Sequence, residues 1–241
     1  MPSSAADAGG FLATHWTVVI AAAQVKESSR ARAAMTELCQ TYWYPLYAYL
    51  RRQGRDVHAA EDLTQSFFAQ LLSPQFLANV DRNKGKFRAF LLASLKNFLA
   101  DEYDRAQAQK RGGDRLPIAL DGLAAEVRYQ LEPAHDLTPE RLYAKQWALS
   151  VLEQVLSRLQ HESSVTQKSE LFEALKPTLT DANAARYAQI GSELGMTENA
   201  VKTAAHRLRR RYRDLLLEEI TQTVSTPDEV EDEIRYLMSC L

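Results

Sequence analysis

The chain has 241 residues, of which 46% are hydrophobic and 25% are charged, so it can form one large or two small folded domains. Its net charge of -2 would argue against nucleic acid binding if the charges were evenly spread, but they are segregated along the chain. Two distant cysteines, Cys39 and Cys240, exclude a disulfide scaffold, and no apolar run approaches the roughly 20 residues of a membrane span. Since the first ten residues also lack signal-peptide features, we expect a soluble cytoplasmic protein.

Helical spacing of apolar residues dominates the first half of the chain, while strand alternation is nearly absent, which predicts an all-α fold. The predicted elements, in chain order, are helices over 31–53 and 57–72, a short helix over 75–80, a polar loop over 81–86 and a long helix over 87–109. Pro45 lies inside the first of these helices and is expected to bend or split it.

The second half begins with a segment punctuated by prolines, 114–139, in which we expect one short helix near 122–130. Further helices are predicted from Pro139 onward, over 171–175, within 186–223 and over 230–237. We therefore divide the chain into five parts, which are an N-terminal extension (1–30), a first helical domain (31–112), a linker (113–138), a second helical domain (139–223) and an acidic tail (224–241).

Residues 186–216, RYAQIGSELGMTENAVKTAAHRLRRRYRDLL, have the pattern of a helix-turn-helix. Gly195 is suited to end the first helix and Thr197 to cap the second. The second helix combines a narrow apolar stripe (Val201, Ala204, Ala205, Leu208, Tyr212 and Leu215) with a polar, cationic face (Asn199, Lys202, Thr203, His206, Arg210 and Arg213). Such a helix suits the major groove of DNA, although an amphipathic surface helix with solvated charges has the same pattern.

The helix predicted over 57–72 has a polar face with an aromatic residue beside it. This face contains Glu61, Asp62, Gln65 and Ser66, with Phe68 as the aromatic neighbour. Carboxylates and amides beside an aromatic ring suit docking onto a basic helical partner, and the alternative is an ordinary solvated face.

The loop over 81–86 and the helix after it carry a second group of positively charged residues. Arg82, Lys84, Lys86 and Arg88 surround Phe87 in the sequence, and a polar face continues through Lys96, Asn97, Asp101 and Arg105. Such a mixture can hold phosphates while the loop captures an unstacked base, whereas the alternative is a charged helix edge.

Together, these segments resemble the bacterial sigma factors of the extracytoplasmic-function type, the smallest class, with two domains. YWYPLYAYLRRQG followed by AAEDLTQSFFAQLL is similar to the polymerase-binding segment of that family, and KFRAFLLASLKNFLADEYDR to the segment that recognises and opens the minus-ten promoter element. YAQIGSELGMTENAVKTAAHRLRRR resembles the helix-turn-helix that reads the minus-thirty-five element. The resemblance covers 31–109 and 146–219, and Lys96 stands where the family more often has arginine.

The resemblance implies a sigma-2-like helical bundle and a sigma-4-like helix-turn-helix domain, with no catalytic residue, metal or cofactor. The residues implied to bind core RNA polymerase are Glu61, Asp62, Gln65 and Phe68. Those implied to bind the minus-ten element are Arg82, Asn83, Lys84, Lys86, Arg88, Lys96, Asn97, Asp101 and Arg105. Those implied to bind the minus-thirty-five element are Asn199, Lys202, Thr203, His206, Arg207, Arg210 and Arg211.

The implied partners are core RNA polymerase and promoter DNA, with an anti-sigma factor or a regulatory kinase as further candidates, no membrane, and a monomeric state when free. A conventional helix-turn-helix repressor or activator remains an alternative, in which the first domain would dimerise or sense a ligand. A helical adaptor is another, but it would leave the cationic face unexplained. An enzyme is disfavoured because the five histidines form no ligand-spaced cluster and no nucleophile motif occurs.

The acidic tail suggests one further hypothesis. Residues 229–241 could fold back on the basic helix and mask it in the free protein, whereas the alternative is a solvated helix end that aids solubility.

Overall fold

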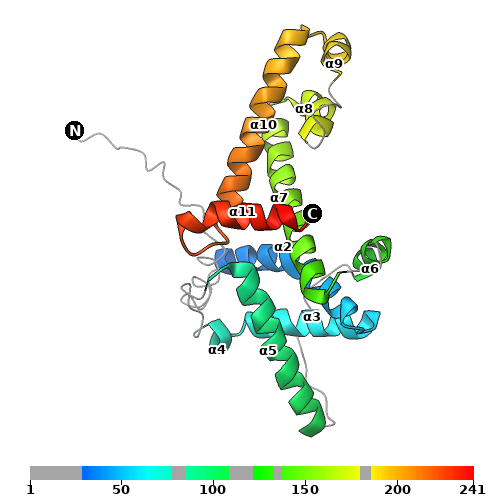
Figure 1. The fold of residues 1–241 in the computed structure, drawn as a ribbon, viewed down its shortest axis with the longest axis vertical. Coiled ribbons are helices and arrows are strands. Elements are labelled where there is room, and N and C mark those ends of the chain that lie inside the picture. The colour runs from blue at the N-terminus through cyan, green and yellow to red at the C-terminus, as the bar shows by residue number, and fades with distance from the viewer. Residues whose placement is uncertain (1–28, 78–84, 109–121, 133–136, 180–185) are drawn as a thin grey trace, which may run out of the picture. The chain divides into compact units, whose positions relative to one another are not determined.

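The computed structural model describes residues 29–77, 85–108, 122–132, 137–179 and 186–241. These ranges are helical and contain no strand, which confirms the predicted all-α fold (Figure 1). The chain forms two compact units, a first one of Met1–Tyr143 with Gln222–Glu229 and a second one of Ala144–Thr221 with Val230–Leu241. No helix in the described ranges has the length and hydropathy needed to cross a membrane.

The first unit is built around three long helices. These are α2 (Ser29–Arg52), α3 (Val57–Leu71) and α5 (Phe87–Ala108), accompanied by the short helices α4 (Pro74–Leu77) and α6 (Gly122–Leu131) and by the start of α7 (Pro139–Val165). Aromatic side chains from all three long helices fill its core, including Tyr42, Tyr47, Tyr49, Phe67, Phe68, Phe87 and Phe98. The observed helices agree with the predicted ones to within a few residues at their ends, and α2 continues through Pro45 without being split.

The short helix predicted near 122–130 is confirmed as α6, and polar contacts attach it to α2. The carboxylate of Glu126 accepts hydrogen bonds from the Tyr47 hydroxyl at 2.5 Å and from Arg51 at 2.8 and 2.9 Å. Arg128 lies over the Tyr44 ring, 4.2 Å from its centroid. The opposite face of α6 leaves the side chains of Leu123, Val127 and Leu131 exposed, so hydrogen bonds and ion pairs, more than apolar burial, hold this helix in place.

The second unit contains the predicted helix-turn-helix. Its elements are the rest of α7, α8 (Ser169–Leu175), the 3-10 turn η2 (Lys176–Leu179), α9 (Tyr187–Leu194), α10 (Glu198–Thr221) and α11 (Val230–Ser239). The apolar stripe of α10 faces the core as predicted, because Val201, Ala205 and Leu215 are buried while Ala204, Leu208 and Tyr212 are partly buried. Leu175 of α8 and Ile190 of α9 join Val201 and Ala205 in one cluster.

The turn between α9 and α10 depends on two glycines. Gly195 ends α9 in the left-handed conformation, with φ 65°, as its place in the sequence predicts. The Thr197 hydroxyl accepts a hydrogen bond from the Ala200 N–H at 3.2 Å, which confirms its predicted capping role. Gly191 lies where the chain approaches itself, since a Cβ atom there would be 2.6 Å from the carbonyl oxygen of Met196. The turn therefore requires a residue without a side chain at 191.

The helix α11 packs on α10 within the second unit and crosses it at the end opposite to α9 (Figure 1). Glu233 and Leu237 of α11 are almost fully buried, so this helix belongs to the folded unit.

Replacing Gly191 with alanine should destabilise the helix-turn-helix, because the added Cβ collides with the Met196 carbonyl oxygen. We expect Gly191→Ala to lower the free energy of unfolding by about 1–3 kcal/mol in urea denaturation followed by circular dichroism. The matched control is Ser192→Ala, at an exposed position of the same helix. Equal stability of the two variants would contradict the close approach described for this turn.

The ionised form of Glu126 should contribute stability that is lost in acid. The hydrogen bonds from Arg51 lower the pKa of Glu126, so its stabilisation is present at neutral pH and disappears as the pH falls below about 5 and through the folded-state pKa. Glu126→Gln should lower the free energy of unfolding by about 2 kcal/mol at pH 7, with a smaller difference from the wild type at pH 3. Asp104→Asn, which alters an exposed carboxylate of α5, serves as the control. A loss for Glu126→Gln that is equal at both pH values would refute the role of the ionised group.

Candidate functional site

The polar face of α10 is presented to solvent. Six side chains of α10 that were expected to contact DNA are exposed, namely Asn199, Lys202, Thr203, His206, Arg207 and Arg210. Lys202 makes an ion pair with Glu198 one turn earlier, with 2.6 Å between Nζ and Oε1. Such exposed pairs contribute little to stability, so the ammonium group can exchange its partner for a phosphate at small cost.

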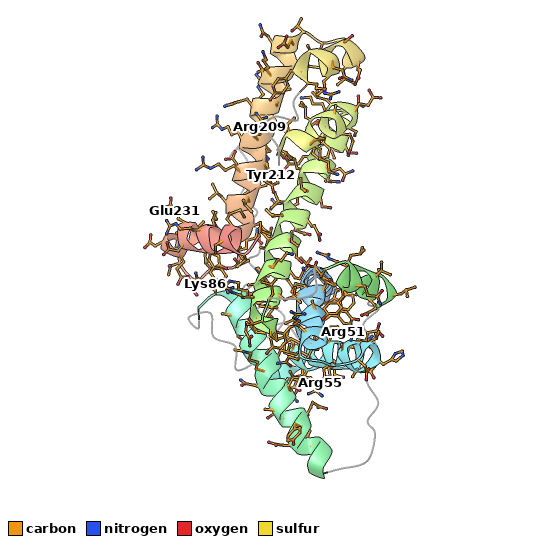
Figure 2. All side chains as sticks on the ribbon, turned by 45° about the vertical axis from the view of Figure 1, so that its right-hand side comes forward. Arg51, Arg55, Lys86, Arg209, Tyr212 and Glu231 are labelled. Atoms are coloured by element: carbon orange, nitrogen blue, oxygen red, sulfur yellow. The ribbon has the colours of Figure 1, made fainter. Side chains whose placement is uncertain are left out.

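Two neighbouring arginines of α10 have structural partners instead. Arg209, labelled with Tyr212 in Figure 2, donates hydrogen bonds to the Thr178 carbonyl at 3.2 Å and to the Tyr187 hydroxyl at 2.9 Å. It thereby connects α10 to η2 and α9.

Arg211 donates to both carboxylate oxygens of Glu162, at 2.8 and 2.6 Å, and to Glu218 at 3.2 Å. These hydrogen bonds raise the pKa of Arg211 and lower the pKa of Glu162. Arg211 therefore holds α10 against α7 in the free protein, and its contact with DNA stays a prediction.

The polar face of α3 is narrower than the sequence predicted. Asp62 is exposed and Glu61 and Gln65 are half-buried, whereas Ser66 is buried and Phe68 is 0% exposed. The placement of Phe68 on the exposed face was wrong, because α3 buries a broad arc that includes both of its phenylalanines.

The rings of Phe67 and Phe68 are 5.5 Å apart within the core. Phe68 therefore supports the helix from inside, and a partner protein cannot reach it in this conformation.

Glu61 of α3 lies against the start of α6. A Cβ atom at Gly122 would be 1.8 Å from the Oε1 atom of Glu61, so the carboxylate lies directly against the backbone of residue 122. One of the predicted polymerase contacts is thus partly covered by α6, while Asp62 remains open to solvent.

The polar face of α5 is exposed along its predicted length. Lys96, Asn97, Asp101 and Arg105 are exposed, and Lys86 and Arg88 at the start of the helix are half-buried. Lys96 pairs with Glu140 at 2.8 Å and lies over the Tyr49 ring, which raises the pKa of Lys96 and lowers that of Glu140. Arg82, Asn83 and Lys84 lie outside the described residues.

Phe87, which the sequence places among these cations, is fully buried and cannot stack on a base. Its ring packs edge-on against Tyr42, with centroids 6.3 Å apart, and lies 6.0 Å from the ring of Phe90. Its backbone N–H donates to the Thr223 carbonyl at 2.8 Å, and the Tyr143 hydroxyl donates to the Arg88 carbonyl at 2.8 Å.

The contacts of Tyr143 and Thr223 with the start of α5 were not predicted, because a contact between positions so far apart in the chain leaves no local periodicity.

The acidic tail does not mask the DNA-facing residues in the way the sequence suggested. Although α11 does pack on α10, it crosses the opposite end of that helix, and Lys202, His206 and Arg207 remain exposed. Glu231, labelled in Figure 2, is itself exposed on α11.

Among the residues that the structure describes, no group of three or more histidine, cysteine, aspartate or glutamate side chains is placed to hold a metal ion. A cavity of about 660 Å³ lies beside α10, and its lining includes Asn199, Thr203 and Arg207.

Residues 38–109 match the family model for Sigma-70 region 2. The matched range runs from within α2 through α3 and α4 to the end of α5, and leaves the helix-turn-helix outside it. Comparisons with curated proteins and with solved structures give no significant match. Sigma-70 factors are non-enzymatic transcription initiation factors that bind RNA polymerase and take part in promoter recognition and melting, and the region 2 match supports a sigma-70 family sigma factor.

Proposed function

We propose that this protein is a sigma factor of the two-domain, extracytoplasmic-function type, which directs core RNA polymerase to specific promoters in the cytoplasm. The observation that carries the proposal is the order of two elements in one chain. A segment matching Sigma-70 region 2 is followed by a helix-turn-helix whose second helix exposes a cationic face. The helix-turn-helix alone would not distinguish a sigma factor from other helical DNA-binding proteins.

The polar face of α3 is the proposed contact with core polymerase. Asp62 is its most exposed acid, and Glu61 and Gln65 flank it on the same helix. An acidic patch of this kind favours a basic helical surface on the partner, because complementary charge speeds association and sets orientation. Phe68 contributes to this contact only by holding α3 in place.

The α5 face is the proposed reader of the minus-ten element. Lys86, Arg88, Lys96 and Arg105 supply positive charge along one helix, and Asn97 and Asp101 supply hydrogen-bonding groups beside them. Unstacking a base costs a few kcal/mol, so a melted strand needs compensating contacts of this kind. The loop over 81–86 is the proposed pocket for the flipped base.

The α10 face is the proposed reader of the minus-thirty-five element. Asn199, Lys202, Thr203, His206 and Arg207 occupy the first turns of the helix, which in this motif approach the base edges. Arg210 is placed further along and is available to a phosphate.

Because two DNA-reading surfaces share the binding energy, each can be weak alone, and engagement of one raises the effective concentration of the other. We propose that α10 by itself binds DNA weakly, that the free protein is a monomer, and that an anti-sigma factor or a regulatory kinase is a further partner.

Run-off transcription tests the proposal directly. The full-length protein mixed with core polymerase should produce a transcript from a promoter upstream of its own gene, and the two should co-elute on a sizing column. Asp62→Lys should weaken binding to core polymerase at least tenfold, because it places a like charge against the proposed basic partner.

Asp104→Lys, which makes the same charge change at an exposed position of α5, is the control for core binding. If no complex with core polymerase forms, or if the protein alone protects a palindrome as a dimer, the sigma factor proposal is wrong.

The arginines of α10 should separate into two classes by measurement. Arg207→Gln and Arg210→Gln should reduce the affinity of the holoenzyme for minus-thirty-five promoter DNA by about tenfold or less, with little change in stability, because both side chains are exposed. Arg211→Gln should instead lower the free energy of unfolding by about 1 kcal/mol, since it removes the hydrogen bonds to Glu162 and Glu218.

Fluorescence anisotropy on promoter DNA and urea denaturation provide the two readouts. A loss of DNA affinity for Arg211→Gln equal to that for Arg207→Gln, without any loss of stability, would contradict this division.

A further inference from the structure

The segment Gln222–Glu229 follows α10 in the chain but belongs to the first unit. Two of its residues are almost fully buried, Thr223 with 2% and Val224 with 1% of the residue surface exposed. The sequence predicted residues 222 and 223 as the end of a helix and the residues after them as an acidic tail. The structure instead places this segment against the start of α5.

Two hydrogen bonds join the segment to the residues at which α5 begins. The Thr223 carbonyl accepts from the Phe87 N–H at 2.8 Å, which satisfies one of the backbone donors that a helix start leaves without a partner in the helix. The Ser225 hydroxyl donates to the Gly85 carbonyl at 2.9 Å. Gly85 has φ 95°, a conformation that favours glycine. This backbone turn and the hydrogen bond from Ser225 together determine the direction of the Gly85 carbonyl group.

The segment is also held in shape from within. The Glu229 carboxylate accepts hydrogen bonds from the Ser225 N–H at 3.0 Å and from the Thr226 N–H at 3.4 Å. Glu229 thereby fixes the backbone on which the Ser225 hydroxyl is carried. Asp228, its neighbour in the same 3-10 turn, is exposed.

The residues joined in this way directly flank Lys86 and Arg88. Lys86, labelled in Figure 2, lies between Gly85 and Phe87, the two residues that the segment contacts. The Arg88 carbonyl is held in turn by the Tyr143 hydroxyl. A rotation of the peptide units on either side of Lys86 would redirect its side chain, and the two contacts oppose such a rotation.

We propose that Gln222–Glu229 is a positioning element for the minus-ten surface, in which Ser225, held by Glu229, orients the start of α5 for melted, single-stranded promoter DNA. This inference rests on the proposed function of α5 and extends it to a segment outside the Sigma-70 region 2 match. Ser225 acts through Gly85 and is a positioning residue, with no contact to DNA required.

The contact itself is tested in the free, full-length protein by hydrogen–deuterium exchange. Ser225→Ala should increase the exchange of the backbone amides at the start of α5, because it removes the hydroxyl that holds Gly85. Ser225→Thr keeps a hydroxyl and should restore most of the protection. Ser239→Ala, which removes an exposed hydroxyl at the end of α11, should leave α5 unchanged.

The functional role is tested in the holoenzyme with a fluorescent single-stranded oligonucleotide that carries the minus-ten sequence of the non-template strand. Ser225→Ala should weaken this binding about three- to tenfold, the effect of one lost hydrogen bond, with unchanged affinity for core polymerase. Ser225→Thr should recover it.

Alanine substitutions at two acidic residues distinguish the positioning of Ser225 from a general effect of negative charge on DNA binding. Glu229→Ala and Asp228→Ala each remove one negative charge, but only Glu229 holds Ser225. We expect Glu229→Ala to weaken binding of the oligonucleotide and Asp228→Ala to leave it unchanged or slightly strengthened.

The proposal is overturned if Ser225→Ala and Glu229→Ala leave the oligonucleotide affinity unchanged or increase it. An increase would show that the segment masks the surface. If the wild-type holoenzyme forms no transcript, the proposed function is what fails and the DNA role fails with it, whereas the exchange experiment still decides whether the contact exists.

Discussion

Phe87 is fully buried against Tyr42 of α2, and this contact determines where α5 begins. Because an aromatic ring of this size gains much of its stabilisation from burial, the residues on either side of it cannot move far from the core. Gly85 and Lys86 precede it and Arg88 follows it, so the cations at the start of α5 lie at the edge of a rigid core. The proposed minus-ten surface depends on the buried position of Phe87. The hydrogen bonds made by Thr223, Ser225 and Tyr143 then orient the backbone of Phe87 and of the residues next to it.

In the second unit, the side chains of a single helix, α10, also divide into those that hold the structure and those that remain exposed. Along α10, Val201, Ala205 and Leu215 are buried, Arg209 and Arg211 bind groups on neighbouring elements, and Arg207 and Arg210 are left to solvent. Arg209 and Arg211 make hydrogen bonds with carbonyl, hydroxyl and carboxylate groups, and such charge-assisted bonds hold the helix at a defined rotation. The side chains of Arg207 and Arg210 stay exposed to solvent, as the contact residues of a DNA-reading helix must be.

Much of the candidate site could be predicted because its residues follow from local periodicity. The exposed face of α10, the exposed positions of α5 and the short helix α6 were all predicted from spacing and composition, and the structure places them as expected. The prediction for Phe68 was wrong because α3 buries more of its surface than a single apolar stripe. How much of a helix is buried depends on how many other helices pack around it. Arg211 could not be told from Arg210 in the sequence, since its hydrogen bonds to Glu162 of α7 and to Glu218 are what distinguish the two.

The sequence by itself determined the all-α class, the order and approximate ends of the helices, and the resemblance to sigma factors that the region 2 match supports. These properties depend on apolar spacing, glycine and capping residues, and short motifs, all of which lie within a few turns of chain. Only the tertiary structure decided that Phe68 is internal, that Arg211 is paired, and that Ser225 meets Gly85. Such contacts join residues as many as 140 positions apart, and they arise from packing between elements, which no local pattern records.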